Sequence, residues 1–475
     1  MGQLPNSELK KFSDYLRSPL FNSNKKLIDL FDLYLEHGDS SNVSLLSGLK
    51  SCGHHGLSEA TIIKLKNRLV EHLFDYFELE SFRNRNISRK SYLLRYFIRF
   101  DLLKYFEFYR NKGLKNLKQE LWGVNEFAEN FAISMENVVY ETDKSIRSQE
   151  STSSLISALE SLDQMYLAQR LKLQVALRNH LGIIGGQEPQ LIELDLNQLE
   201  EERAGGPVLP VYILMLIRLF KSFDLQGSSG YFHDIMGELT NPNLDISIPD
   251  KKDFFKTLIN ISIKQVHIGE KEYLNYIFEL YEEMRHQDLL LDEDGTLSPY
   301  HLKNIMKSAL LLEKTDWGEN FLVSMRPFFP ENRAEIMYRY HLGLLRFHEK
   351  KYESTIKEME YDKEQDEKFD LFYSCDSRVL LLKALYFMRD HPYRYDEMER
   401  LCISFNGYLK RHRKEIAPQH SQRYKSFVKN FKKMVTTDQV EDWKNIMVSV
   451  DSESLIAEKN WLSEQLTKRI NTRKY

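Results

Sequence analysis

The sequence predicts an all-α protein with almost no β-sheet, an α-solenoid in which antiparallel helix hairpins stack on one another. Three observations support this prediction. Glycine and proline are scarce, apolar residues recur at helical spacing along most of the chain, and the C-terminal half repeats a hairpin-like pattern. These features indicate long helices with few tight turns between them.

The scarcity of turn-forming residues is the first observation. The 475 residues include only 20 glycines and 12 prolines, whereas typical proteins contain about 7% and about 5% of these residues. Because glycine and proline mark most tight turns, a chain with few of them has long elements. Strand-like alternation occurs only at residues 192–196 and 244–248, beside breaks in the helical pattern, which indicates extended connections.

The N-terminal residues illustrate the helical spacing. Phe12, Tyr15 and Leu16 share one face of a predicted helix. Pro19 ends this helix, because the residue before a proline avoids helical backbone angles. An asparagine or serine within residues 22–24 is placed to cap the helix that follows.

Longer helices follow the same pattern. Ser58 is a predicted N-cap, and Glu59 lies in the first turn, where a carboxylate complements the helix dipole. Apolar residues recur at helical spacing in two later stripes: Ile62, Leu69, Leu73 and Phe77, and then Leu155, Leu159, Leu162 and Tyr166. The most apolar window, residues 208–217, predicts a buried helix, because a membrane span needs about 20 residues.

Four breaks interrupt the helical pattern, and two of them suggest a domain boundary. The breaks lie at residues 182–189, 204–210, 239–252 and 291–299. We place the boundary near residues 185–207. It separates an N-terminal helical domain, residues 1–185, from a C-terminal repeat domain, residues 208–475.

The repeated pattern is clearest in the segment YHLGLLRFHEKKYESTIKEM, residues 340–359. It contains a Leu-Gly pair ending at Gly343, an aromatic residue, a short turn, the aromatic Tyr352 and the small residue Thr355. This order resembles the tetratricopeptide repeat, although that family has alanine where this chain has Thr355. Two antiparallel helices cross closely only where side chains are short, and Gly343 and Thr355 would permit such an approach.

Similar units on both sides extend the resemblance over residues 208–435. The aromatic residues that correspond to Tyr352 are Tyr231, Tyr273, Trp317 and Tyr395, at irregular spacing. The 35 residues from Trp317 to Tyr352 come close to the ~34-residue period of the family. The resemblance implies a stack of hairpins with a concave groove for a peptide or a partner helix. A closed helical bundle with similar hairpins is the alternative.

The first residues of the chain resemble a second family. Within ELKKFSDYLRSPLFNSNKKLIDLF, residues 8–31, the likeness is carried by Phe12, Leu16, Ser18, Pro19, Phe21 and Asn22. The segment is similar to the opening of a family of uncharacterised helical proteins from Bacteroidota-type bacteria. This resemblance implies a bacterial origin and no particular mechanism, because the family has no assigned activity.

Motifs for catalysis and for cofactor binding are missing from the sequence. It contains no GxGxxG or GxxxxGK[ST] phosphate loop, no HExxH and no GxSxG. Cys52, His54 and His55 lack the second ligand pair of a structural zinc site. A calcium loop around residues 290–301 would begin at a leucine and end at a histidine, neither of which supplies an oxygen ligand. We therefore expect no cofactor, no metal and no enzymatic activity, with an enzyme site assembled from distant residues as an alternative.

The strongest candidate for partner binding lies within residues 83–118. Eleven basic residues stand there against two acidic ones, with aromatic residues interleaved. Those that share one helical face are Arg89, Tyr92, Tyr96 and Arg99. Such a face could stack bases and contact phosphates, or bind an acidic partner. Alternatively, the aromatic residues belong to the core of an ordinary solvated helix. A smaller basic cluster, residues 410–414, is expected to be a solvated face.

The overall charge sets limits on the partners. A net charge of −4 gives no global attraction to nucleic acid or to anionic lipid. We predict a non-enzymatic scaffold that binds a peptide or partner protein in a helical-repeat groove. The alternative is a nucleic-acid-binding regulator that uses the basic aromatic helices or a helix-turn-helix at residues 43–68, whose turn is long for that motif.

The cysteines and the N-terminus indicate the compartment. The three cysteines form no CxxC pair, which favours a reducing environment. The first residues contain no apolar run of signal-peptide length. We therefore expect a cytoplasmic protein without membrane association.

Overall fold

The computed structural model describes most of the chain. The described residues are 4–38, 41–84, 86–117, 122–144, 149–184, 189–191, 194–201, 209–224, 229–359, 371–389 and 394–472. Within them every regular element is a helix, and the strand-like pairing is one isolated bridge between Trp122 and Ile246. The predicted all-α class is confirmed.

Two compact units divide the chain, and each is described by itself. Unit 1 comprises residues 1–235 and 241–250, and unit 2 comprises residues 236–240 and 251–475. The predicted domain boundary near residues 185–207 falls partly outside the described residues.

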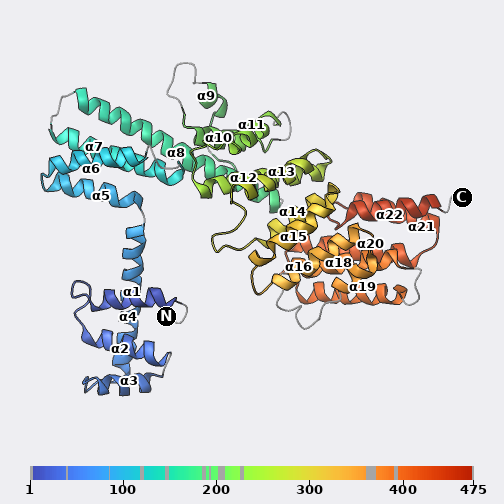
Figure 1. Cartoon of the computed structure of the whole chain (residues 1–475), viewed down its shortest axis with the longest axis horizontal. Coiled ribbons are helices and arrows are strands. Elements are labelled where there is room, and N and C mark those ends of the chain that lie inside the picture. The colour runs from blue at the N-terminus through green and yellow to red at the C-terminus, as the bar shows by residue number, and fades with distance from the viewer. Residues whose placement is uncertain are drawn as a thin grey trace. The chain divides into compact units, whose positions relative to one another are not determined.

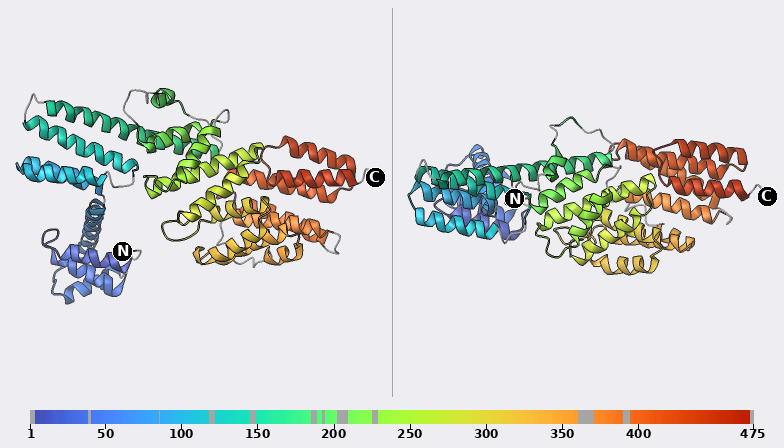
Figure 2. Two further views of the ribbon diagram at one scale, coloured as in Figure 1. Left: turned by 45° about the horizontal axis from the view of Figure 1, so that its top comes forward. Right: turned by 90° about the horizontal axis from the view of Figure 1, so that it is seen from above.

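Unit 1 contains ten complete helices within the described residues (Figure 1). Their bounds are α1 Asn6–Arg17, α2 Lys25–His37, α3 Asn42–Ser51, α4 Glu59–Asn84, α5 Asn86–Arg99, α6 Leu103–Leu117, α7 Val124–Lys144, α8 Gln149–Ile184, α9 Leu196–Glu201 and α10 Val211–Lys221. Two further helices, α11 Ser229–Leu239 and α12 Ile248–Ile268, begin in unit 1 and end in unit 2. Helices α7 and α8 pack side by side, as Figure 2 shows.

The N-terminal helices begin and end where the sequence predicts. Helix α1 ends at Arg17, directly before the Ser-Pro pair. The side chain of Asn24 caps α2 by accepting a hydrogen bond from the backbone N–H of Lys26 at 3.1 Å. Ser58 Oγ accepts from the backbone N–H of Thr61 at 3.3 Å at the start of α4. Both caps satisfy N–H groups that the first turn of a helix leaves unpaired.

A buried carboxylate joins distant segments of unit 1. Asp250, only 6% exposed, accepts hydrogen bonds from the Tyr212 hydroxyl at 2.8 Å and from the Lys172 ammonium at 2.7 Å. The Ser247 hydroxyl donates to its other oxygen at 2.6 Å, and the backbone N–H of Ser247 donates to the carbonyl of Trp122 at 3.0 Å. Because hydrogen bonds to charged groups are the strong ones, this cluster ties residues 241–250 to α8 and α10.

Unit 2 continues with ten α-helices and one 3-10 helix within the described residues (Figure 1). Their bounds are α13 Tyr273–His286, α14 Pro299–Leu311, α15 Thr315–Met325, the 3-10 helix η2 Arg326–Phe328, α16 Ala334–His348, α17 Tyr352–Met359, α18 Leu371–Phe387, α19 Arg394–Arg411, α20 Pro418–Thr436, α21 Val440–Ser452 and α22 Lys459–Thr472, where η2 is a single turn. Each α-helix from α13 onward contacts the next one along the chain, and α16 also contacts α14 and α18.

Helices α16 and α17 approach each other closely at two small residues. Thr355 is fully buried, and its hydroxyl donates to the carbonyl of Gly343 at 3.2 Å. A Cβ atom on Gly343 would lie 2.6 Å from the Cε of Met359, so a larger side chain would displace that methionine. The close approach expected from the sequence is therefore present in this hairpin, whereas membership of the tetratricopeptide family stays a prediction.

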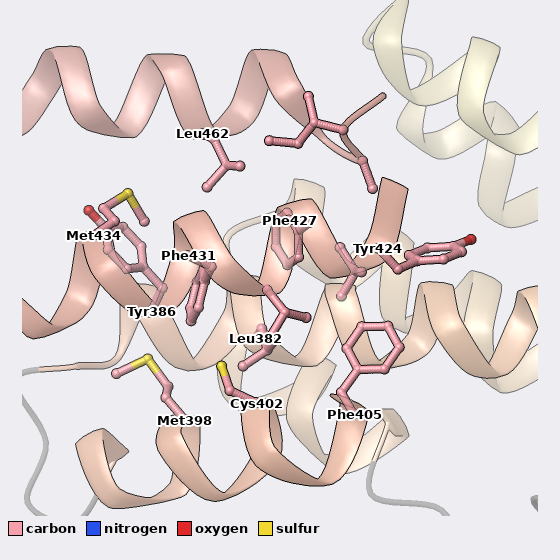
Figure 3. Packing of buried hydrophobic residues seen from close by; sticks show 14 of the residues in the cluster. Leu382, Tyr386, Met398, Cys402, Phe405, Tyr424, Phe427, Phe431, Met434 and Leu462 are labelled. Atoms are coloured by element: carbon pink, nitrogen blue, oxygen red, sulfur yellow. The ribbon is translucent and has the colours of Figure 1, made fainter. Parts of the chain in front are cut away.

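Aromatic rings fill the core between α18, α19, α20 and α22 (Figure 3). The rings of Phe427 and Phe431 stack with centroids 5.6 Å apart, and Tyr386 meets Trp461 edge-on at 5.4 Å. Cys402 is buried in the same cluster. Such ring pairs add attraction beyond the burial of their area, and the pair of Tyr386 and Trp461 stabilises the contact between α18 and α22.

The most apolar segment of the sequence forms a buried helix, as predicted. This segment lies in the first part of α10, which begins at Val211. The side chains of α10 from Tyr212 to Ile217 are all buried. Among the described residues, no helix has both the length and the apolar character that crossing a membrane requires.

Candidate functional site

The predicted binding residues lie on α5, in unit 1. Tyr92 and Tyr96 are one helical turn apart and are 50% and 55% exposed. Arg99 is the last residue of α5 and is also exposed. Arg89 belongs to the same helix, but its side chain lies outside the described residues. The described members of the predicted set therefore point to solvent from one helix.

The opposite side of α5 and one side of α6 form the local core. Leu94 and Phe106 are buried, and the Phe106 ring stacks on Tyr140 of α7 with centroids 4.2 Å apart. The Tyr140 hydroxyl donates to Glu107 at 2.6 Å. The alternative in which the aromatic residues belong to the core holds for Phe106 and for Phe97, which packs against this cluster, whereas the half-exposed Tyr92 and Tyr96 are not core residues.

Helix α6, together with Phe100 directly after α5, adds exposed rings that the sequence interpretation did not assign to the site. Phe100, Tyr105 and Phe108 are 60%, 58% and 61% exposed. The α5–α6 aromatic surface is formed by Tyr92, Tyr96, Phe100, Tyr105, Phe108 and Tyr109. Exposed apolar patches often coincide with binding sites, which makes this surface the candidate site.

Contacts between neighbouring rings form separate groups within this surface. Tyr96 stacks on Phe100 with centroids 6.0 Å apart. Phe97, between the two helices, lies 6.0 Å from Tyr105 and 5.4 Å from Tyr109. Rings that support one another hold a defined shape, which lowers the entropy lost when a partner binds.

Several basic residues of the predicted patch are neutralised by α7. Lys90 lies 2.8 Å from the carboxylate of Glu129, and Arg95 lies 2.7 Å from that of Glu136. Both glutamates are buried, at 1% and 4% exposure. The sequence interpretation missed these acids because they follow their partners Lys90 and Arg95 by about 40 residues and lie on a different helix. These ion pairs hold α5 to α7 and reduce the positive charge that a ligand would meet.

Four other cations remain on α5 and α6: Arg99, Lys104, Lys112 and Lys115. They are exposed, and within the described part of the chain no carboxylate lies within 4 Å of any of them. The guanidinium of Arg99 lies 5.6 Å from the centre of the Phe100 ring, and the ammonium of Lys112 lies 5.9 Å from that of Tyr109. The surface therefore combines apolar rings with a positive border.

The candidate zinc residues and the candidate helix-turn-helix make contacts that serve the local packing of the helices. His54 Nε2 lies 2.6 Å from the carboxylate of Asp29, which ties the turn after α3 to α2. Helices α3 and α4 flank the long turn of the helix-turn-helix interpretation, and Lys66 packs its ammonium 5.7 Å from the Tyr34 ring. Among the described residues, no group of three or more His, Cys, Asp or Glu side chains is arranged to hold a metal ion.

Known proteins offer no counterpart from which a role could be transferred. No model of a protein family, no curated protein and no solved structure matches the chain. The function of the α5–α6 aromatic surface is therefore argued from its own chemistry.

Proposed function

We propose that the chain is a non-enzymatic scaffold that binds a partner protein or peptide. The α5–α6 aromatic surface is the observation that supports this function. Aromatic residues and arginine are enriched at protein interfaces and dominate their binding energy. Covering the exposed half of one such ring removes roughly 100 Å² from water, which is worth ~2.5 kcal/mol at ~25 cal/mol per Å².

Unit 2 would support the same scaffold function if it is a tetratricopeptide-like solenoid. Its helices contact their neighbours in sequence order, as expected for stacked hairpins. The short contact between Thr355 and Gly343 fits the small positions of that repeat. We propose a bacterial, cytoplasmic setting for this scaffold, based on the sequence resemblances and on its cysteines.

A protein partner suits the α5–α6 aromatic surface better than nucleic acid. Lys90 and Arg95 are already paired with buried glutamates, so fewer cations face a ligand than the sequence suggests. Single-stranded nucleic acid requires a continuous positive groove beside its stacking rings. The four bordering cations keep nucleic acid as the second candidate, and the two candidates differ in their response to salt.

Affinity capture with matched variants tests the proposal. The variant Tyr96→Ser with Phe108→Ser removes two exposed rings, and the control Ile403→Ser with Val448→Ser removes two apolar residues of unit 2 that are 60% and 68% exposed. We expect proteins that are retained by the wild type and by the control but lost from the first variant.

Two outcomes contradict the proposal. One is an identical set of retained proteins for all three chains, which would show that the surface is unused. The other is a gel shift of single-stranded oligonucleotides that weakens steeply with salt and disappears in the variant Tyr96→Ser with Phe108→Ser, which would favour nucleic acid.

A further inference from the structure

Three helices of unit 2 converge on one carboxylate. Asp376 of α18 accepts a hydrogen bond from the ammonium of Lys303 on α14 at 2.7 Å. Its other oxygen accepts from the hydroxyl of Tyr424 on α20, also at 2.7 Å. Figure 3 shows the Tyr424 hydroxyl directed away from the apolar core. The side chain of Asp376 is 33% exposed, so the cluster lies at the surface.

A second ion pair lies two turns further along α18. The ammonium of Lys383 contacts the carboxylate of Glu458 at 2.7 Å, and the Glu458 side chain is 35% exposed. The positive charge of Lys383, with a smaller effect from Lys307, lowers the pKa of Glu458 to about 2. The residue before Glu458 donates its backbone N–H to the carbonyl of Arg423 at 3.1 Å, which places Arg423 beside this pair.

Two further cations on these helices form no ion pair within 4 Å among the described residues, although the charge of Lys307 reaches Glu458 at longer range. Lys307 lies one turn after Lys303 on α14, Arg423 precedes Tyr424 on α20, and both are exposed. Within the described residues neither has a carboxylate within 4 Å. Burial lowers the pKa of His267, and the charges of Lys307 and Arg423 lower it further. Both cations therefore act on one region of the surface.

These groups make up the unit 2 charged face: Lys303, Lys307, Asp376, Lys383, Arg423 and Glu458. It carries four cations and two carboxylates. The two ion pairs hold four side chains in place and leave Lys307 and Arg423 to meet an incoming anion. We propose that the unit 2 charged face binds an acidic segment of a polypeptide, with its carboxylates paired to Lys307 and Arg423.

A polypeptide fits this face better than a nucleic acid. A peptide can place single carboxylates opposite Lys307 and Arg423 and leave neutral residues opposite Asp376 and Glu458. A phosphate backbone carries a charge on every nucleotide and would be repelled by both carboxylates, which are 33% and 35% exposed. The site is separate from the α5–α6 aromatic surface, so it goes beyond the proposed function and can fail or succeed independently of it.

Fluorescence anisotropy with the full chain tests the proposal. The probe is a labelled peptide of alternating glutamate and serine, and its control is the matching glutamine–serine peptide. The variant Lys307→Glu with Arg423→Glu reverses both free charges. The variant Lys410→Glu with Arg413→Glu makes the same change in net charge on exposed residues of another surface.

We expect saturable binding of the glutamate peptide, weakened at least tenfold in Lys307→Glu with Arg423→Glu and by no more than about twofold in the control variant, since long-range attraction is screened by salt. The same charge-reversed variant should bind a lysine–serine peptide that the wild type does not. If circular dichroism shows that this variant is misfolded, Lys307→Gln with Arg423→Gln takes its place.

Several results would overturn the proposal. The first is the absence of saturable binding to the glutamate peptide, or equal binding of the glutamine peptide. The second is an equal loss in both charge-reversed variants, which would indicate general charge attraction. The third is tighter binding of a single-stranded oligonucleotide with the same dependence on Lys307 and Arg423, which would assign the face to nucleic acid.

Discussion

At the scale of single residues, unit 1 depends on a few polar side chains placed inside the core. Asp250 gathers hydrogen bonds from Tyr212, Lys172 and Ser247 on one buried carboxylate. Losing any of these donors leaves part of a buried charge unsatisfied, which costs more than an exposed bond does. The space around Asp250 is also filled, because the backbone of Gly123 lies against its Oδ2 atom.

Gly123→Ala should destabilise unit 1. The added Cβ would clash with the carboxylate of Asp250 and force its hydrogen-bonded partners to shift, and overpacking of this kind costs about 1–3 kcal/mol. Gly182→Ala is the matched control, because nothing lies within 4 Å of its Cβ and it is helical. That change should be neutral or stabilising by up to about 1 kcal/mol. Urea unfolding checks both values, and equal effects would contradict the interpretation.

Buried histidines should make unit 2 sensitive to acid. Burial lowers the pKa of His301 to about 4 and that of His341 well below its ordinary value. Since the unfolded chain protonates near pH 6.5 and the folded chain does not, stability should be constant above that pH and fall as the pH drops towards 4.

For His301 alone the loss at pH 5 is about 2 kcal/mol. Urea unfolding at pH 7.5 and at pH 5 measures it. His301→Gln should show a smaller loss than the wild type, whereas His286→Gln, which changes an exposed residue, should behave like the wild type. A wild-type stability that does not fall between these pH values would contradict the prediction.

At the scale of elements, α5 and α6 are held by α7 through rings and charges. Phe106 stacks on Tyr140, and Lys90 pairs with Glu129, which is 1% exposed. These contacts fix which faces of α5 and α6 meet solvent. The exposure of the α5–α6 aromatic surface is therefore a consequence of how α7 occupies the other side.

Lys90→Met should loosen this three-helix arrangement. The substitution keeps the apolar stem but removes the ammonium, which leaves the carboxylate of Glu129 buried without that partner. We expect a loss of about 2 kcal/mol in the free energy of unfolding. Lys104→Met on α6 is the control, since Lys104 is exposed, and it should change stability by less than about 0.5 kcal/mol. Comparable losses in the two variants would argue against a structural role for Lys90.

At the scale of the whole molecule, helical spacing predicted the fold class but not the exposed surfaces. The stripe of Leu155, Leu159, Leu162 and Tyr166 has the spacing of a buried face, yet these residues are 50%, 60%, 37% and 46% exposed. Periodicity reports that a helix has an apolar side, whereas burial depends on which other helix covers that side. No pattern within α8 contains that information.

The candidate site was also predictable only in part: the shared helix face was predicted, but the pairing of its charges was not. The spacing of Tyr92 and Tyr96 identified a shared face on one helix. The neutralisation of Lys90 and Arg95 was not predictable, because Glu129 and Glu136 lie on a different helix that reaches them only after folding. Local spacing predicts which side chains share one face of a helix. Tertiary contacts determine which of those side chains stay exposed and unpaired after folding.

Thiol labelling reports on the folded chain as a whole. Cys52 is exposed, whereas Cys375 and Cys402 are buried at 0% and 1% exposure. Burial raises the pKa of Cys402 to about 12, so its reactive thiolate is scarce at neutral pH. We expect one cysteine to react quickly with a thiol reagent in the native state and all three after denaturation, as counted by mass spectrometry. Fast native labelling of Cys375 or Cys402 would contradict this packing.

The carboxylate of Asp250 also determines how the chain can be shortened. A fragment that stops at residue 185 or at residue 207 discards Asp250, together with the segment that meets the backbone of Trp122. Lys172 would then lose the carboxylate that it contacts in the intact chain. An N-terminal fragment should therefore extend through residue 250, because a fragment that ends at residue 185 or at residue 207 lacks Asp250 and leaves the interior around Lys172 and Tyr212 incomplete.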